Sequence, residues 1–433
     1  METQNPALLE FLRRKHSHHP IPFHLLVEEA LYNEQFGFYC GQEAGIKLFG
    51  AGNRPIDFSK LENRDQFMDY LVKLHETHPG AYKTPVEIYS PYFGIGLARY
   101  IEFLFVFGDL PPVIYEVGAG NGTLAYDLLD YLQSYQPDLF NRVTYSIVEK
   151  SDKLAAIQAE RLARFGGKVA WRRGDARSLP FGNNSLEGVV VHSELLDNLP
   201  NACIRRKKQS HPVRLDDFVE IHYQFVDGRL VEKEAPLSVR VKNFISQRSS
   251  LLTPGEYAPS LDISPGENAY IGIGAADFYK ELGRVLKNGF VVGFDYNSLG
   301  RDMEGSYTQM DIHTGDDYLD FLGNLGIADI YFSVDCWTLA NIARSYGLQA
   351  IDLIKPQGAF FKDIFGGRDW ERLCLGKDGY VAPILRSPSN TFCLINHKGV
   401  ESDFNYFYVH QRQIVQRHIA QNEDLTLGRQ TQP

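Results

Sequence analysis

The sequence predicts an open α/β fold of the Rossmann-like type, and two patterns support this. Short β-rich runs alternate with helical runs between Pro111 and about Ile354, which is typical of a parallel sheet with crossover helices. A glycine-rich loop also separates the first strand from the first of these helices. The expected strands are Val113–Val117, Thr144–Glu149, Val169–Arg173, Gly188–His192 and Phe290–Asp295.

Three helices are expected between these strands. The segment Leu124–Tyr135 carries four leucines at helical spacing, and Asp277–Leu286 is an amphipathic segment that precedes the last strand. A third helix, Ser151–Phe165, begins with a serine suited to cap its N-terminus. The apolar stripe of this third helix is expected to consist of Leu154, Ile157, Leu162 and Phe165.

The remaining segments flank or interrupt this core. Residues 1–110 are expected to form a mostly helical N-terminal section, which includes a glycine-rich loop near Phe49–Pro55. An insertion at 200–270 contains a predicted β-hairpin, Val213–Glu234, that turns at Asp227-Gly228. The expected division is therefore an N-terminal section of 1–110, a core of 111–355 with this insertion, and a C-terminal extension of 356–433 that is polar from about Val400.

Composition limits the classes of function. The 433 residues carry a formal charge of −10, which argues against a general nucleic-acid binder. No apolar run approaches the roughly 18 residues of a membrane helix, and the five cysteines form no C-x-x-C pair that would indicate a metal site. A cytoplasmic location is expected. A mitochondrial one is less favoured, because Glu2 and Glu10 accompany the basic run Arg13–Lys15. A homodimer is left open.

The loop after the first strand indicates the cofactor. Gly118, Gly120 and Gly122 follow a strand that carries Glu116, and glycines let a backbone turn tightly and approach a ligand closely. A dinucleotide fingerprint would require glycine where Thr123 stands, which disfavours an NAD-dependent oxidoreductase. A carboxylate beside the loop suits a cofactor with positive charge, and S-adenosyl-L-methionine carries a sulfonium and an ammonium group. The sequence therefore favours S-adenosyl-L-methionine.

Two later acids extend this site. Glu149 ends the second strand, where an acid commonly holds ribose hydroxyls in Rossmann-like sites, although an ordinary strand-end charge is the alternative. Asp175 follows the third strand at a position suited to the adenine edge, although Gly174-Asp175 is also common turn chemistry.

The fourth strand leads into an acidic turn. Glu194 and Asp197 are three residues apart, so a helical turn would place both carboxylates on one side. Such a pair can hold a guanidinium group by two hydrogen bonds and fix its nitrogen for attack. We expect these two residues to be catalytic, and the alternative is that Asp197 only caps the turn.

Together, these motifs resemble the MidA-like methyltransferase family, over roughly residues 21–355. The resemblance implies a class I methyltransferase fold, the S-adenosyl-L-methionine cofactor and a protein arginine as acceptor, as for the family's mitochondrial complex I assembly factor. It also implies that Glu87, Asp295 and Tyr296 line the acceptor side. The matching segments include Glu116–Leu129 (EVGAGNGTLAYDLL), Ser193–Pro200 (SELLDNLP), Thr84–Glu87, Phe93-Gly94, Asp295-Tyr296, Phe36–Tyr39 and Asp329-Ile330 with Val334-Asp335.

The sequence departs from the family pattern on the acceptor side. Ser193, Asn198 and Asn297 stand where the family has Asn, Ala and Gly. We therefore expect an S-adenosyl-L-methionine-dependent methyltransferase whose partner is a methyl acceptor, either protein or small molecule. The alternatives are a methyltransferase of specialised small molecules and a non-catalytic assembly protein that keeps the cofactor fold.

Overall fold

A computed structural model describes residues 5–17, 19–41, 47–48, 66, 69, 81–82, 84–208, 214–250, 263–296, 310–314, 317–318, 320–365 and 391–400. The expected glycine-rich loop near Phe49–Pro55 and the polar tail after Val400 lie outside these residues. Within the described part of the chain, no helix is both long and apolar enough to cross a membrane.

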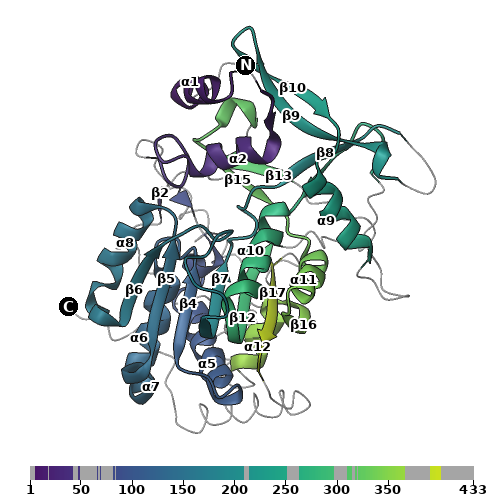
Figure 1. The fold of residues 1–433 in the computed structure, drawn as a ribbon. Coiled ribbons are helices and arrows are strands. Elements are labelled where there is room, and N and C mark those ends of the chain that lie inside the picture. Colours follow the sequence, from purple (N-terminus) through teal and green to yellow (C-terminus); the bar gives the residue numbers. More distant parts are fainter. Residues whose placement is uncertain are drawn as a thin grey trace.

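The centre of the fold is a seven-stranded sheet in the order β16-β17-β12-β7-β4-β5-β6 (Figure 1). The five predicted strands pair in parallel, whereas β17 runs antiparallel to both β12 and β16. Three of the predicted strands have the expected bounds, and β7 and β12 are longer. The bounds are β4 (Val113–Val117), β5 (Thr144–Glu149), β6 (Val169–Arg173), β7 (Leu186–Ser193), β12 (Leu286–Tyr296), β16 (Gln349–Pro356) and β17 (Thr391–Lys398).

Helices cover both faces of this sheet. Side chains of α5, α6 and α12 form one buried cluster against it, and side chains of α10 and α11 form the other. The predicted leucine face of α6 is confirmed, because all four of its leucines are buried. The helices are α5 (Tyr92–Phe107), α6 (Thr123–Tyr135), α7 (Pro137–Arg142), α8 (Asp152–Leu162), α10 (Ile273–Val285), α11 (Cys336–Ser345) and α12 (Gln357–Phe365).

The helix after β5 differs from its prediction in two ways. Ser151 caps it as expected, but α8 ends at Leu162 and a 3-10 segment, η2 (Ala163–Lys168), follows. Its buried face contains Gln158 between Leu154 and Leu162, whereas the predicted Ile157 is only half-buried. The apolar stripe was therefore wrong at one position, because a polar side chain occupies the inner face.

The predicted hairpin is confirmed and belongs to a second, antiparallel sheet. Strands β9 and β10 pair across Asp227-Gly228, and both turn residues have the positive φ that a tight hairpin turn requires. The N-terminal strand β1 joins β9, so the first section of the chain and the insertion share one sheet. The elements are β1 (Ile21–Pro22), β8 (Ala202–Arg206), η3 (Leu215–Asp217), β9 (Phe218–Val226), β10 (Arg229–Ala235), α9 (Val239–Ser250) and β11 (Asn268–Ile271).

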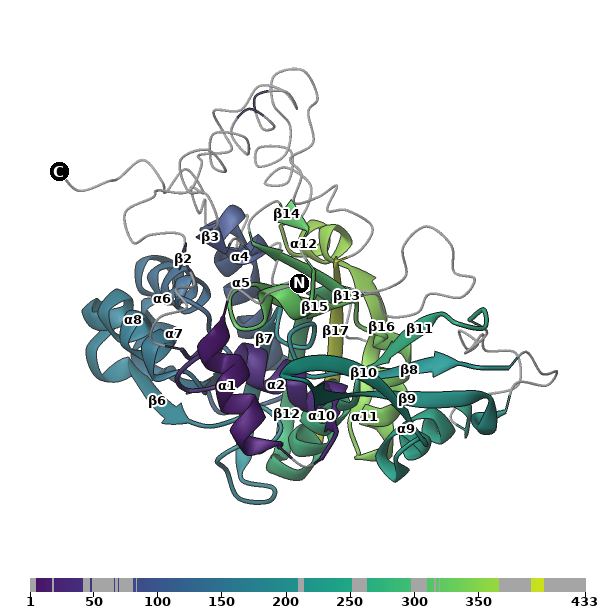
Figure 2. The same cartoon turned by 90° about the horizontal axis from the view of Figure 1, so that it is seen from above.

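The N-terminal helices pack on this second sheet. Buried residues of α1 and α2 form one apolar cluster with β9 and β15. Together they make a layer beside one end of the central sheet (Figures 1 and 2). The remaining elements are α1 (Pro6–Lys15), α2 (Phe23–Tyr32), β2 (Lys47–Leu48), β3 (Ala81–Tyr82), α4 (Pro85–Ile88), β13 (Met310–Thr314), β14 (Asp317–Tyr318), η4 (Leu322–Asn324) and β15 (Asp329–Phe332).

Elements from both flanking sections cross the boundaries expected from the sequence. Helix α5 lies before residue 110 yet packs directly on the central sheet. Strand β17 lies beyond residue 355 yet sits between β12 and β16 within that sheet. The central sheet and its covering helices therefore include chain from both flanking sections, while the division into three units stays a prediction.

Candidate active site

A pocket lies where the central sheet meets the N-terminal layer. Its empty volume is about 930 Å³, which includes open solvent at the mouth and falls within the range of small-molecule sites. The walls come from the loops after four parallel strands and from the N-terminal segments that face them. Predicted residues in these walls are Glu87, Glu116, Gly118, Gly120, Glu149, Asp175 and Glu194.

The glycine loop after β4 has the backbone that only glycine adopts readily. Gly118, Gly120 and Gly122 have φ values of 72°, 53° and 82°. A Cβ atom built on Gly120 would meet nothing within 4 Å, so this part of the loop faces open space in the pocket. Gly122 is the N-cap of α6 and is not among the residues that line the pocket. The loop therefore leaves a cradle that a ligand, rather than the protein, can fill.

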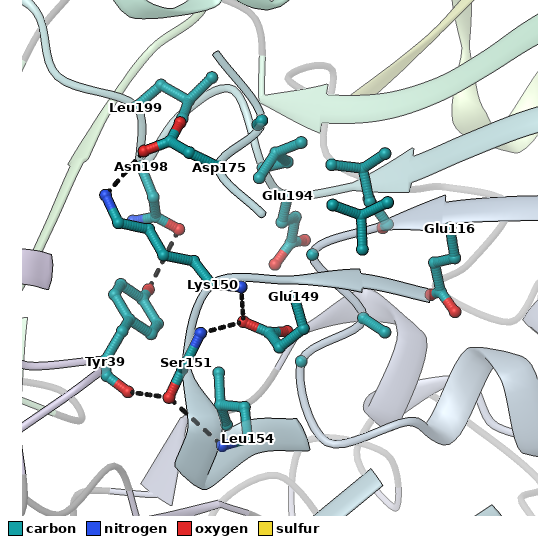
Figure 3. A pocket seen from close by; sticks show the side chains of 18 of the residues that line it. Tyr39, Glu116, Glu149, Lys150, Ser151, Leu154, Asp175, Glu194, Asn198 and Leu199 are labelled. Carbon is teal, nitrogen blue, oxygen red and sulfur yellow. Dashed lines mark hydrogen bonds and ion pairs between the residues drawn. The ribbon is translucent and has the colours of Figure 1, made fainter. Parts of the chain in front are cut away.

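Glu149 is buried at the end of β5, and its carboxylate is held by three hydrogen bonds, of which Figure 3 shows the two from the backbone of Lys150 and Ser151. The backbone N–H groups of Lys150 and Ser151 each donate to Oε1 at 2.9 Å, and Gln158 Nε2 donates to Oε2 at 2.9 Å. Burial raises the pKa of Glu149, and these hydrogen bonds oppose the rise. A carboxylate with four acceptor positions thus keeps one of them for a ligand.

Glu116 lies beneath the glycine loop. Its side chain is only 2% exposed, and Tyr145 Oη donates a hydrogen bond to its Oε2 at 2.8 Å. Burial raises the pKa of Glu116 to about 7, although Tyr145 counteracts this. A cation bound in the pocket would favour the charged form of this carboxylate.

Asp175 sits among cations. Its carboxylate accepts hydrogen bonds from Lys150 Nζ at 2.7 Å and from the backbone and guanidinium of Arg177. Burial would raise the pKa of Asp175, but Arg177 and Lys150 hold it well below its ordinary value. Because the four acceptor positions are already used, a contact with an adenine edge would have to replace one of these bonds.

Comparison with known proteins identifies the family. Residues 102–354 match a family profile described as "Putative S-adenosyl-L-methionine-dependent methyltransferase". The chain belongs to this methyltransferase family. This match, together with the two solved structures described next, confirms the fold, the MidA-like resemblance and the cofactor predicted from the sequence. No curated protein matches the chain.

Two solved structures from Burkholderia thailandensis share the fold over nearly the whole chain. One, a COG1565 superfamily member described as a "likely methyl transferase" bound to S-adenosyl-homocysteine, has a TM-score of 0.66 at 20% identity and covers 93% of this chain and 95% of its own. The other, an uncharacterised protein of the same superfamily, has a TM-score of 0.62 at 18% identity and covers 93% and 94%.

The described residues fit the cofactor of this family. The open cradle at Gly120 and the spare acceptor position of Glu149 are the features that a nucleoside group with ribose hydroxyls needs. The buried carboxylate of Glu116 provides the negative charge that a sulfonium or ammonium group favours.

The side of the pocket that the sequence assigned to the methyl acceptor contains crowded carboxylates. Glu194 lines the pocket and has a φ of 48°, so the turn after β7 is not helical as the pairing with Asp197 assumed. Asp197 is 3% exposed and does not line the pocket. Burial and then the neighbouring Asp295 raise the pKa values of both carboxyl groups well above the ordinary range. Glu194 Oε1 and Asp197 Oδ1 are buried without a hydrogen-bond partner among the described residues.

Asp295 and Tyr296 support this turn from β12. Oδ2 of Asp295 accepts the backbone N–H groups of Leu195 and Leu196, at 3.3 and 2.9 Å, and neither Asp295 nor Tyr296 lines the pocket. Burial raises the pKa of Asp295 to about 7, although these backbone donors oppose the rise. The side chain of Tyr296 donates a hydrogen bond to the carboxylate of Glu194. The structure thus places both residues behind the turn that follows β7, outside the pocket wall.

Glu87 lines the pocket from α4, where its carboxylate also accepts the backbone N–H of Thr84 at 2.8 Å in a capping box. Burial raises the pKa of Glu87, whereas Thr84 lowers it.

Sequence reasoning gave no role in the site to several individual side chains that cover and brace the pocket. Tyr32 and Tyr39 stack with ring centroids 5.6 Å apart, and Tyr32 Oη donates to the carbonyl oxygen of Asn198 at 3.0 Å. Lys150 joins Glu28 on α2 to Asp175 (Figure 3 shows the second contact). Tyr32 contacts Asn198, and Glu28 contacts Lys150, across more than 100 residues of sequence, so these contacts leave no local sequence signal. Gln158 did leave a local sequence signal, because it is a polar residue on the predicted inner face of a helix.

Proposed function

We propose that the chain transfers the methyl group of S-adenosyl-L-methionine to a nitrogen of a cationic acceptor, with a protein arginine as the favoured substrate. The observation that carries this proposal is Glu194 in the pocket wall, with a buried carboxylate oxygen that has no partner among the described residues. A buried acceptor without a donor is costly, so a ligand with N–H groups in this position stabilises it.

The charge around Glu194 favours a cation over a neutral acceptor. Asp295 and Glu87 are close enough to raise the pKa of Glu194, after the larger effect of burial. A guanidinium group compensates several neighbouring carboxylates and offers two parallel N–H donors to one of them. We therefore assign Glu194 to direct contact with the acceptor and Asp197 to the electrostatic field behind it.

The cofactor side follows from the same pocket. We assign the loop of Gly118, Gly120 and Gly122 to close approach of the cofactor, Glu149 to its ribose hydroxyls and Glu116 to its positive charge. The role of Asp175 at the adenine edge stays a prediction, because the described cations already use its acceptor positions.

The chemistry asked of the protein is positioning. The cofactor supplies a methyl group on a positively charged sulfur, which leaves as a neutral thioether when the new bond to nitrogen forms. Glu194 would hold the attacking nitrogen in line and accept the proton that the nitrogen loses. Positioning and exclusion of water can provide most of the acceleration of such a displacement.

A labelling experiment tests the proposal. The purified protein is incubated with methyl-labelled cofactor and a lysate of its source organism, and protein and small-molecule fractions are separated. The expected result is a labelled protein that releases methylarginine on hydrolysis. Label in a small molecule would contradict the protein acceptor, and tight cofactor binding without any labelled product would favour the non-catalytic assembly protein.

A further inference from the structure

Gln158 is a fully buried polar residue on the inner face of α8, with an exposed fraction of 0%. The neighbouring positions on this face, Leu154 and Leu162, are buried leucines. A polar side chain in such a place needs hydrogen bonds to offset its loss of water. The hydrogen-bond partners of Gln158 indicate which groups it positions.

The side-chain amide of Gln158 makes three hydrogen bonds. Its Nε2 donates to the carbonyl oxygen of Gly120 and to Oε2 of Glu149, both at 2.9 Å, while its Oε1 accepts from Trp171 Nε1 at 3.2 Å. A flipped amide would place its oxygen against two acceptors and its NH₂ group against the indole N–H. Trp171 therefore fixes the direction in which Gln158 donates.

These bonds decide where Glu149 can accept another donor. Two backbone N–H groups occupy Oε1, and Gln158 takes one position on Oε2. The remaining position belongs to Oε2, and Glu149 forms part of the pocket wall. Without the hydrogen bond from Gln158, the orientation of the Glu149 carboxylate would be fixed only through Oε1.

The same amide also braces the glycine loop. It holds the carbonyl oxygen of Gly120, and the position of a Cβ atom on Gly122 lies 3.4 Å from both Cα and Cγ of Gln158. One side chain thus contacts the two parts of the cofactor site that lie on different strand–helix connections.

We propose that Gln158 is a positioning residue. It directs the remaining acceptor position of Glu149 towards the ribose of the cofactor, and it holds the glycine loop in a fixed place relative to Glu149. This inference rests on the proposed placement of the ribose at Glu149. It adds a residue that touches no substrate yet sets the affinity for the nucleoside part of the cofactor, with Trp171 as its orienting partner.

Binding of two nucleosides separates positioning from bulk structure. S-adenosyl-homocysteine and its analogue without the ribose 2′- and 3′-hydroxyls are titrated into the wild type and Gln158→Met, which keeps length but loses the amide. Affinity for S-adenosyl-homocysteine should fall roughly 10- to 100-fold in the variant, the usual effect of losing a buried hydrogen bond to a charged group. Affinity for the analogue should fall several-fold less, because it has no hydroxyls for Glu149 to hold.

Matched variants complete the design. Gln133→Met removes the amide of an exposed glutamine on α6 and should leave both affinities unchanged. Trp171→Phe leaves Gln158 in place but removes its orienting donor, so it should weaken S-adenosyl-homocysteine in the same direction by a smaller factor. This second variant serves if Gln158→Met lowers the thermal midpoint too far for titration.

Three results would overturn the inference. Unchanged affinity for S-adenosyl-homocysteine in Gln158→Met and Trp171→Phe would remove any positioning role. An equal loss for both nucleosides would make Gln158 a structural brace of the loop alone. If the wild type binds both nucleosides equally and Glu149→Ala binds as the wild type does, the ribose does not lie at Glu149. The labelling experiment still reports methyl transfer in that case, so the two failures are distinguishable.

Discussion

The carboxylates on the two sides of the pocket differ in the hydrogen bonds that they accept from the chain. On the cofactor side, Glu149 and Asp175 accept hydrogen bonds from backbone, amide and cationic groups of the chain itself. On the acceptor side, Glu194 and Asp197 each have a buried oxygen without a partner among the described residues. The first arrangement is organised before a ligand binds, whereas Glu194, which lines the pocket, depends on a ligand to complete its hydrogen bonds.

Position in the sequence explains much of this contrast. The cofactor side is built within one continuous stretch of chain between Glu116 and Asp175, from the loops that follow β4, β5 and β6. The acceptor side combines three distant segments, α4, the turn after β7 and the end of β12. Changes on the cofactor side should therefore act on affinity, and changes on the acceptor side on turnover.

The largest effect is expected from Gly120→Val. At a φ of 53° the substitution adds strain, but the Cβ atom meets no protein atom, so the branched side chain projects into the cofactor cradle. Affinity for S-adenosyl-homocysteine should fall by more than about 100-fold, which corresponds to roughly 2.7 kcal/mol. Titration calorimetry measures this, with NAD as a ligand that should not bind.

Gly166→Val is the matched control for that prediction. Gly166 has a φ of 52° and equally open space at its Cβ position, but it lies in η2 outside the pocket wall. Both positions have a positive φ that a valine adopts only with strain, so Gly166→Val should lose thermal stability and keep its affinity. Equal affinities for the two variants would show that Gly120 does not face the cofactor.

Glu194→Gln should lower turnover by roughly 100-fold while cofactor affinity stays within a few-fold of the wild type, because misplacing a reacting group costs rate on this scale. Asp197→Asn should act in the same direction, and the double variant should be far from additive if both carboxylates serve one bound cation. Initial rates with the acceptor found by labelling give the comparison. Glu187→Gln, on the strand that precedes Glu194 and half-exposed beside Lys287, is the control.

A weaker cofactor complex in Glu194→Gln would contradict this division. It would mean that the free oxygen of Glu194 holds the cofactor itself, and the two sides of the pocket would not be separate. Full activity in both single variants would instead show that Glu194 and Asp197 do not serve one bound cation.

Glu149→Ala should weaken cofactor binding by about 1–3 kcal/mol, the usual result of leaving buried polar groups unpaired. The backbone N–H groups of Lys150 and Ser151 and the amide of Gln158 would all lose their acceptor. Asp152→Ala removes an exposed carboxylate three residues later and should bind as the wild type does. An unchanged dissociation constant for Glu149→Ala would return this residue to an ordinary strand-end charge.

The same contrast explains what could be predicted from the sequence. Strands β4, β5 and β6 and the glycine loop carry local signals, in their apolar runs and in the residues that permit positive φ, and they were predicted with correct bounds. The non-helical turn at Glu194 was not, because its shape follows from the hydrogen bonds that Asp295 accepts about 100 residues away. Strand β17 was missed for the same reason, since its antiparallel place depends on two distant partners.

The smallest expected effect concerns Asp127, which is buried on α6 with 7% exposed. Burial raises the pKa of Asp127 to about 7, although Ser90 donates a hydrogen bond to its carboxylate at 2.5 Å. The unfolded chain titrates this group near 3.9, so between these values the folded protein binds more protons than the unfolded one. Its contribution to stability is therefore complete at acid pH and is lost as the pH rises through about 7.

Asp127→Asn removes this dependence on pH, because the amide stays neutral and its oxygen can still accept from Ser90. The difference in thermal midpoint between variant and wild type should shift in favour of the variant from pH 5 to pH 8, by at least about 2 °C. Glu116 and Asp295, whose pKa values are also raised to about 7, titrate in both proteins and cancel in the difference. Asp130→Asn, three residues along α6 and ion-paired with Arg164 at the surface, supplies the control. A difference that stays constant across this range would show that Asp127 is already ionised in the folded protein, with the Arg161 charge that favours its carboxylate outweighing burial.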